Sequence, residues 1–245
     1  IDNLYKLEET LEVAGNRSDN QKSSIKKFYP FKEISCEQIS YSYKDEQGQP
    51  LFTLGPIDLS VNHGEILFIV GGNGSGKTTL LKLLTGLYSP HEGKLKLDGK
   101  TIDQSSYPNF RQLYSIVFSD FHLFDRLYGL KKIDESRVDK LLKQMQLDEK
   151  TEYQDGKFTT IKLSTGQRKR LALIISSMED KEIYIFDEWT ADQDPQFRKY
   201  FFENIIKDMQ KNGKTIIAIT HDDRYFHMAD RVIKMEYGKV IEEGH

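Results

Sequence analysis

The stretch ILFIVGGNGSGKTT, residues 66–79, decides how the rest of the chain is interpreted. Residues 66–70 form a short apolar run that predicts a buried β-strand, and the leucine-rich segment after Lys77 predicts a helix. The glycines between them fit the spacing G-x-x-x-x-G-K-[ST], which predicts a loop whose backbone N–H groups hold polyphosphate. Glycine suits such a loop because it tolerates positive φ angles and allows close approach of the phosphates. The predicted phosphate-contacting residues are Gly71, Gly72, Asn73, Gly74, Ser75, Gly76, Lys77, Thr78 and Thr79.

Two side chains of this loop are expected to carry specific chemistry. Lys77 would reach the β- and γ-phosphates as a compact point charge, and the hydroxyl of Thr78 would bind Mg²⁺. The helix that follows adds free N–H groups and the positive end of its dipole. A flexible glycine turn is the alternative interpretation, but the strand before the loop and the helix after it are the context that a phosphate loop requires.

Composition narrows the class of protein. The chain has 245 residues, which fits one α/β domain with a small subdomain. Its net charge of −3 gives no electrostatic case for nucleic acid as a partner. Cys36 is the single cysteine, so there is no disulfide framework and a reducing compartment is compatible. No apolar run approaches transmembrane length, and the start at Ile1 rather than Met suggests a fragment of a longer protein.

The pattern of apolar residues divides the chain into regions. Residues 1–12 have helical spacing, which is compatible with a packed terminus or with the end of a helix arriving from another domain. Alternation over residues 31–43 and 57–61 predicts an antiparallel sheet with one solvated face. Residues 183–186 and 215–220 are continuous apolar runs, typical of parallel strands buried on both faces.

Two helical segments are also predicted. A spacing of i, i+3, i+4 and i+7 after the candidate N-cap Asp134 indicates a mostly helical insertion from about residue 111 to 167. Asp194 and Pro195 resemble an N-cap and a first helical residue. The stripe expected on the buried face of that second helix is Phe197, Phe201, Ile205 and Met209.

Two further motifs suggest chemistry. Asp187 and Glu188 follow an apolar strand, where carboxylates face the ligand crevice of a parallel sheet. Asp187 is positioned to hold Mg²⁺ through water, and Glu188 to act as the base toward an attacking water. Residues 163–167, with the sequence LSTGQ, open a predicted helix and offer hydroxyl and N–H groups to an anion. A solvated acidic pair and an ordinary serine N-cap are the respective alternatives.

In their order along the chain, these motifs resemble those of the nucleotide-binding domain of ATP-binding cassette (ABC) proteins. The residues that carry the resemblance are 71–79, 163–167, 186–188, Asp194 and His221, and it covers about residues 31–245. It implies a P-loop NTPase core with a parallel sheet, an antiparallel β-subdomain and a helical subdomain, which binds ATP with Mg²⁺ and hydrolyses the ATP. It also implies that Ser164, Thr165 and Gly166 complete the ATP site of a second copy in a head-to-tail homodimer.

The resemblance suggests roles for individual residues. Tyr43 matches the aromatic residue on which adenine stacks, with Tyr41 as the alternative. His221 matches the histidine that contacts the γ-phosphate, and joins Glu188 and Lys77 as a candidate catalytic residue. Asp194 matches the acidic end of a loop that communicates across the dimer, although this chain has Ala-Asp-Gln-Asp where the family usually has Ser-Ala-Leu-Asp.

One departure concerns the metal. The family usually places a glutamine where this chain has Ser119, in the loop that joins the core to the helical subdomain. Asp120 is an oxygen ligand of the kind that Mg²⁺ accepts, so either Ser119 or Asp120 is expected to approach the metal.

Residues 118–125 and 187–194 also resemble a narrower group, bacterial half-transporters that export cyclic or modified peptides and siderophore precursors. In that group a transmembrane domain precedes the ATPase at the cytoplasmic face of the inner membrane, so residues 1–30 would be the linker from it. The aromatic residues Phe118, Phe121, Phe124 and Tyr128 would then receive a coupling helix or be buried in the helical subdomain. The alternatives are a non-transport ABC ATPase, an importer ATPase subunit and a non-enzymatic nucleotide-binding module.

Overall fold

The computed structural model describes residues 31–130 and 132–244, which fall into two compact units. The larger unit contains residues 31–121 and 180–244, and the smaller contains the described residues of 122–179. The helix expected within residues 1–12 and the linker expected over residues 1–30 lie outside the described residues. Within the described ranges, no helix combines the length and the apolar character needed to cross a bilayer.

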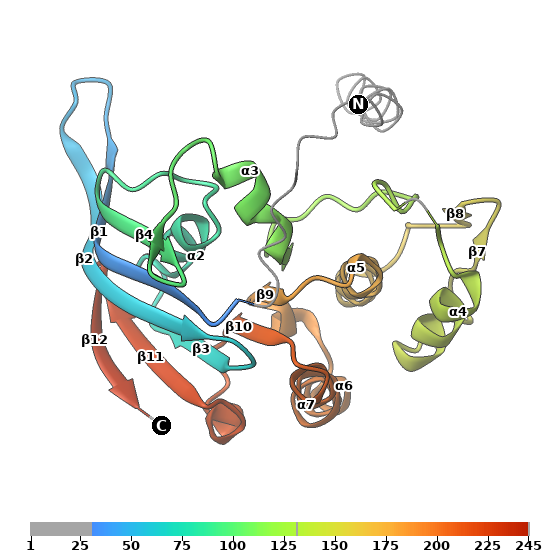
Figure 1. Ribbon diagram of the computed structural model, residues 1–245. Helices are drawn as coiled ribbons and strands as arrows, with labels where there is room; N and C mark the ends of the chain where they lie inside the picture. Colours follow the sequence, from blue (N-terminus) through green and yellow to red (C-terminus); the bar gives the residue numbers. More distant parts are fainter. Residues whose placement is uncertain (1–30, 131, 245) are drawn as a thin grey trace. The chain divides into compact units, whose positions relative to one another are not determined.

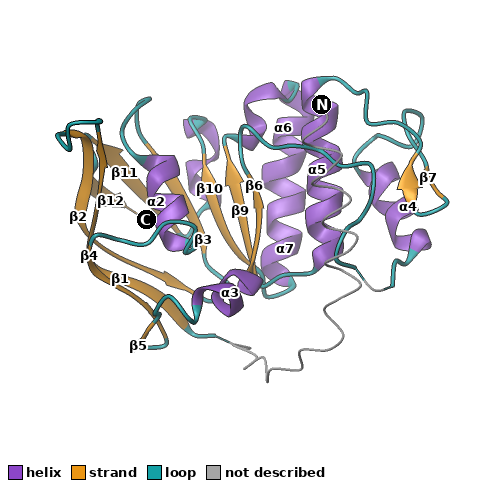
Figure 2. Ribbon diagram, turned by 90° about the horizontal axis from the view of Figure 1, so that it is seen from above, coloured by secondary structure: helices purple, strands orange, loops and turns teal. Residues whose placement is uncertain are grey.

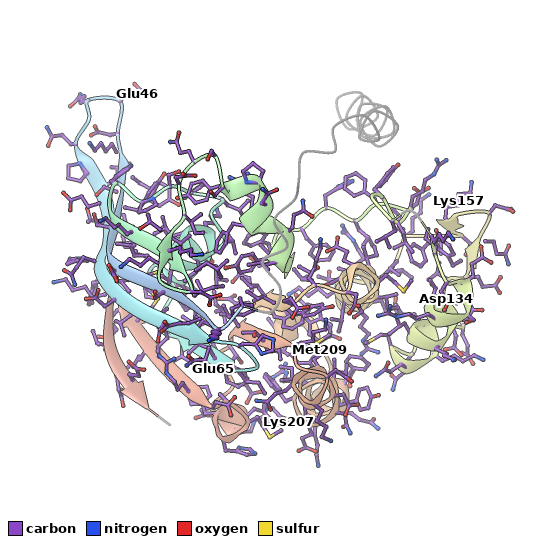
Figure 3. All side chains as sticks on the ribbon, in the orientation of Figure 1. Glu46, Glu65, Asp134, Lys157, Lys207 and Met209 are labelled. Carbon is purple, nitrogen blue, oxygen red and sulfur yellow. The ribbon has the colours of Figure 1, made fainter. Side chains whose placement is uncertain are left out.

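The larger unit contains an antiparallel sheet, as the alternation predicts. Its four strands have the order β2-β1-β4-β5 (Figure 1). The strands are β1 (Glu33–Lys44), β2 (Pro50–Asn62), β4 (Glu92–Leu97) and β5 (Lys100–Thr101). Glu46 marks the tip of the β1–β2 hairpin in Figure 3, whereas Ile34 and Cys36 of β1 point into the core.

A six-stranded sheet forms the centre of the same unit, in the order β12-β11-β3-β10-β9-β6. Its strands are β3 (Ile66–Val70), β6 (Tyr114–Val117), β9 (Ile183–Asp187), β10 (Thr215–Ile219), β11 (Arg231–Glu236) and β12 (Lys239–Gly244). All neighbouring strands are parallel except the β11–β12 hairpin. The predicted parallel core is therefore confirmed, and the carboxyl ends of β3, β9 and β10 meet at one edge, where ligands bind in such sheets.

Each face of the central sheet is covered by a different layer. Helix α2 (Lys77–Leu84) lies between the two sheets (Figure 1), where its leucines pack with Leu67 and Ile69. The opposite face packs against a continuous helical segment beside β9 and β10 (Figure 2), with Phe68 against Phe202 and Phe186 against Phe201. That segment consists of α6 (Pro195–Tyr200), a π-helix (Phe201–Ile206) and α7 (Lys207–Lys211). Short helical pieces complete the unit at α3 (Tyr107–Phe110), Arg111–Leu113, Trp189–Asp192 and Asp223–Met228.

The π-helix corrects one expectation about this segment. Phe197, Phe201 and Ile205 are buried as predicted, but Met209, labelled in Figure 3, is only partly buried. Phe202 and Ile206 are fully buried in addition. A π-helical turn contains more residues than an α-helical turn, so the face of the helix that meets the sheet shifts after Phe201.

The smaller unit contains two helices, α4 (Glu135–Gln144) and α5 (Thr165–Glu179), and the short hairpin β7 (Tyr153–Gln154) with β8 (Lys157–Phe158). Asp134 caps α4 by accepting from the Arg137 N–H, as the sequence predicts, and lies at the helix start in Figure 3. The side chain of Arg137 donates to the Ser177 carbonyl at 2.9 Å and so connects α4 with α5.

The boundaries of this unit differ from the expected residues 111–167. Tyr114–Val117 form the edge strand β6, which pairs with β9, so the separate unit begins only at residue 122 and continues through α5. The four residues of β6 are too few to show a period, and their partner strand lies far away in sequence.

Candidate functional site

The loop between β3 and α2 is fixed by backbone contacts. Gly71 has φ 143°, and a Cβ there would overlap the carbonyl oxygen of Met235, so only glycine fits. The Ser75 N–H donates to the Gly72 carbonyl at 3.2 Å, and the Gly238 N–H of the β11–β12 turn donates to the Ser75 carbonyl at 3.0 Å. Within the described residues, the buried Oγ of Ser75 has no hydrogen-bond partner. These backbone contacts fix the shape of the loop, and Ser75 adds a buried hydroxyl to it.

Lys77 is buried inside this loop. Its Nζ donates to the carbonyls of Gly71 at 2.8 Å and Gly72 at 3.0 Å, and lies 3.9 Å from Oε1 of Glu188. Burial lowers the pKa of Lys77, while the negative charges of Glu188 and Asp187 oppose that shift. The lysine is therefore a partly desolvated cation that hydrogen-bonds to neutral carbonyls.

Asp187, the last residue of β9, meets Thr78 at the start of α2. The Thr78 hydroxyl donates to Oδ2 of Asp187 at 3.2 Å, and the backbone N–H of Ser119 also donates to this carboxylate. Burial raises the pKa of Asp187, because its negative charge is largely removed from water. The hydroxyl and carboxylate oxygens form a donor set of the kind that suits Mg²⁺. The structure thus brings the Ser119 backbone to this pair, whereas the side chains of Ser119 and Asp120 are exposed.

Glu188 and His221 follow neighbouring strands and contact each other. Nε2 of His221 lies 3.0 Å from Oε1 of Glu188. Glu188 has a positive φ of 50°, and its N–H donates to the Ile219 carbonyl at 3.2 Å, so β10 helps hold the strained residue in place. The carboxylate is partly exposed and thus accessible to water.

A cleft of about 490 Å³ lies above the loop. Its lining residues are Tyr43, Phe52, residues 73–79 and Glu188. The hydroxyl of Tyr43 lies 3.4 Å from Oγ1 of Thr79. Tyr41, the alternative, instead stacks on Tyr88 and His91, with ring centroids 5.0 and 4.6 Å apart.

Phe52 is the lining residue that sequence reasoning missed. It lies opposite Tyr43 in the β1–β2 register, and the two ring centroids are 6.4 Å apart. The signal that was available is the hairpin itself, because its turn at residues 45–50 places these two aromatic residues side by side.

Ser164, Thr165 and Gly166 belong to the smaller unit, at the start of α5. The Ser164 N–H donates to Oε1 of Gln167 at 3.1 Å, and the Gln167 N–H donates back to Oγ of Ser164 at 3.4 Å. This reciprocal pair is a capping box, so the serine N-cap that was the alternative interpretation of this motif is present. Ser164 and Thr165 are exposed.

Asp194 caps α6, where the Phe197 N–H donates to its Oδ1 at 2.9 Å. Among the described residues, it is not part of the lining of the 490 Å³ cleft. The structure therefore unites Tyr43, the phosphate loop, Asp187, Glu188 and His221 in one unit. The family roles of Asp194 and of residues 164–166 stay predictions.

Comparisons with known proteins identify the family of the chain. Residues 54–191 match the family model described as ABC transporter. The chain is 46% identical over 214 residues to the ATP-binding protein SyrD of Pseudomonas syringae pv. syringae, covering 86% of this chain but only 38% of SyrD. It is 33% identical over 232 residues to the energy-coupling factor transporter ATP-binding protein EcfA1 of Mycoplasma genitalium, covering 88% of this chain and 80% of that protein.

A solved structure shows the same fold. The match is cbiO1 from Clostridium perfringens, part of the ABC transporter complex cbiONQ, with a TM-score of 0.69 and 31% identity over 87% of this chain and 88% of that one. These similarities extend across both described units, and the glycine loop, the buried aspartate and the adjacent glutamate occupy one edge of the sheet. The chain therefore belongs to the ABC transporter family, as an ATPase domain.

Proposed function

We propose that this chain powers an exporter, in which ATP closes a homodimer of ATPase domains and hydrolysis reopens it. The observation that carries the proposal is a chain of contacts at the cleft: Nζ of Lys77 lies 3.9 Å from Oε1 of Glu188, which lies 3.0 Å from Nε2 of His221. It supplies a cation, a base and the positioning partner of that base. The 46% identity to SyrD and the variant loops at residues 118–125 and 187–194 support export of a cyclic or modified peptide or a siderophore precursor.

In this proposal, different residues of the chain bind the phosphates of ATP and activate the attacking water. Lys77 exchanges its bonds to the carbonyls of Gly71 and Gly72 for bonds to phosphate oxygens, helped by the loop N–H groups and the Ser75 hydroxyl. Glu188 accepts a proton from the water that attacks the γ-phosphate. His221 holds the Glu188 carboxylate in place, contacts the γ-phosphate and donates to its developing charge.

Thr78 and Asp187 would hold Mg²⁺, since their oxygens already lie 3.2 Å apart at the edge of the cleft. When bound, the ion would neutralise charge on the β- and γ-phosphate oxygens. We also propose that Ser119 or Asp120 approaches the metal, because the Ser119 N–H already reaches Asp187. The test compares Ser119→Ala and Asp120→Asn: one of them should raise the Mg²⁺ concentration needed for half-maximal ATPase activity. An unchanged Mg²⁺ requirement in both would end this assignment.

Dimerisation supplies the second half of each site. Ser164, Thr165, Gly166 and Asp194 would face the ATP bound by the other copy, and of these Ser164, Thr165 and Asp194 are exposed. Phe118, Phe121, Phe124 and Tyr128 are each only partly buried, as expected of aromatic residues that receive a helix from a membrane domain. In this proposal, the ATPase works at the cytoplasmic face of the bacterial inner membrane.

Glu188→Gln tests the proposal. The amide keeps the shape of the side chain but cannot accept the proton, so turnover should fall by roughly 10²–10³-fold while ATP binding remains. Size-exclusion chromatography with ATP and Mg²⁺ should then show a stable dimer. Glu203→Gln, at an exposed position whose ion pair with Lys199 is long at 3.9 Å, is the control. Normal hydrolysis by Glu188→Gln would show that Glu188 is not the base. A protein that stays monomeric with ATP and Mg²⁺ would contradict the proposed ATP-driven dimer.

An importer ATPase subunit is the second candidate, favoured by the similarity to EcfA1 over most of that protein's length. The two candidates differ in what the gene encodes before Ile1. Membrane-spanning segments there would support the exporter, whereas a short leader to a free subunit would support the importer.

A further inference from the structure

A second cavity, of about 250 Å³, shares Glu188 with the cleft above the phosphate loop but none of the residues of that loop. Three segments line it: the loop after β9, the start of α6 and the loop after β10. The lining residues are Glu188, Thr190, Ala191, Arg198, Thr220, His221, Asp222 and Arg224. Arg198 comes from the helix and therefore from neither catalytic loop.

The guanidinium of Arg198 connects the two loops. Its Nη2 donates to the carbonyl of Gln193 at 3.1 Å, and its Nη1 lies 3.3 Å from Oδ2 of Asp222. Gln193 is buried and belongs to the segment that starts with Glu188, whereas Asp222 is the residue after His221. A planar fork with several fixed donors can hold two acceptors at once, which a lysine cannot do with the same geometry.

Asp222 is itself firmly placed. Arg224 donates to both of its carboxylate oxygens at 2.7 Å, and the Asp222 N–H donates to Oγ1 of Thr220 at 3.1 Å. The hydrogen bonds from Arg224, and then those from Arg198, lower the pKa of Asp222 below its ordinary value, so it stays anionic near neutral pH. Arg198 therefore contacts a rigid acceptor adjacent to His221.

The helical segment that carries Arg198 also packs aromatic rings against the same two loops. Trp189, next to Glu188, stacks on Phe201 at 4.3 Å, and Tyr225, four residues after His221, stacks on Phe202 at 4.4 Å. Both phenylalanines lie in the π-helix, a distortion that is frequent at functional sites. The segment from α6 into the π-helix thus contacts both loops, and Arg198 makes its polar contacts.

We infer that Arg198 is a positioning residue for ATP hydrolysis, which keeps Nε2 of His221 on Oε1 of Glu188 by bridging Gln193 and Asp222. Without the bridge, the two loops keep their aromatic contacts but lose their fixed separation. A displacement of about 1 Å of a catalytic group lowers the rate without removing the substrate site. The inference rests on the ATPase activity and not on the direction of transport.

The test measures ATPase kinetics of the purified protein with Arg198→Leu, Arg198→Lys and Lys199→Leu. Arg198→Leu should lower kcat by about tenfold and leave the KM for ATP within about twofold, because the lost contact acts on the transition state. Arg198→Lys, which keeps one of the two contacts, should recover part of kcat. Lys199→Leu is the matched control, since Lys199 is adjacent on the same helix but 64% exposed.

Two further measurements keep the result interpretable. Trp189 is the single tryptophan and is buried, so an unchanged fluorescence maximum shows that the aromatic packing is intact. Asp222→Asn combined with Arg198→Leu should be no slower than the slower single variant if both act through one bridge. Additive losses, a rise in KM without a fall in kcat, or equal losses in Lys199→Leu would each overturn the inference. Should Arg198→Leu not fold, Arg198→Lys and Asp222→Asn carry the same test.

Discussion

Two helix N-termini in this chain are predicted to bind the phosphates of ATP, and their surroundings differ. At the start of α2, the side chains of Lys77 and Thr78 are already engaged with Gly71, Gly72 and Asp187, and part of this network is buried. At the start of α5, Ser164 and Thr165 are exposed, and the hydrogen bonds of the Ser164 cap go to Gln167 in the same turn.

The contrast shows that the side chains at the start of α2 are held by contacts with other segments, whereas the start of α5 is an ordinary helix cap. The α2 end holds a buried cation and a buried carboxylate, and burial removes both charges from water, which is unfavourable in free energy. Contacts with a bound ligand would offset this loss of hydration. The α5 end is a relaxed cap with no buried charge at Ser164. We therefore expect changes at α2 to affect binding within one copy, and changes at α5 to affect turnover that depends on a second copy.

Among the changes that test this contrast, Lys77→Ala should have the largest effect. The loss of a charge-assisted contact to phosphate is worth about 2–3 kcal/mol, so the affinity for ATP should fall by roughly 30- to 150-fold. Titration with fluorescent ATP measures it. Lys82→Ala, in the same helix with its ammonium over the Tyr88 ring, is the control and should bind ATP normally. If Lys77→Ala binds ATP as tightly as wild type, the start of α2 is not the end that determines ATP affinity.

Ser164→Asp tests the predicted role of the start of α5. Aspartate caps helices as well as serine does, so thermal stability should stay within about 0.5 kcal/mol of wild type. Its negative charge would repel the phosphates held by the partner, so ATPase activity should fall by about tenfold while a single copy binds ATP normally. Activity assays, calorimetric binding at low protein concentration and thermal unfolding separate these effects. Full activity would mean that Ser164 only caps α5.

Much of this contrast could be read from the sequence, because it depends on local patterns. The glycine spacing at residues 71–78, the acids after β9 and the serine before α5 all lie within short segments whose structure their neighbours determine. What could not be read depends on distant partners. β6 pairs with a strand more than sixty residues away, and the π-helix moves Met209 out of the stripe. Arg198 has no motif, and its role appears only when Gln193 and Asp222 are brought together.

Asp187→Asn tests whether the buried carboxylate at the start of α2 lowers the free energy of unfolding when no nucleotide is bound. Burial raises the pKa of Asp187, so the folded state binds the proton more tightly than the unfolded state. Stability therefore falls as the pH rises from about 4 through the raised pKa, and at neutral pH the ionised carboxyl is unfavourable.

The amide removes this penalty. In the absence of nucleotide, Asp187→Asn should be more stable than wild type at pH 7 by about 0.5–2 kcal/mol, and the gap should narrow in acid. Urea unfolding at several pH values measures it, with the exposed Asp208→Asn as control. A variant that is less stable than wild type at neutral pH would show that the contacts from Thr78 and Ser119 outweigh the burial.

Tyr43→Ala gives the smallest expected effect, because it removes a contact at the rim of the α2 half-site. Stacking of a base on an aromatic ring is worth about 1 kcal/mol or more, so the KM for ATP should rise by roughly fivefold with kcat unchanged. Tyr43→Phe keeps the ring and loses the hydrogen bonds of the hydroxyl, to Thr79 at 3.4 Å and to Tyr88, so its KM for ATP should resemble that of wild type. Tyr41→Ala is the matched control: its ring is already stacked on Tyr88 and His91, so its loss should lower stability but not affinity. If Tyr41→Ala raises the KM and Tyr43→Ala does not, the adenine base stacks on Tyr41 and not on Tyr43. The α2 half of the site would then extend to the aromatic residues around Tyr41.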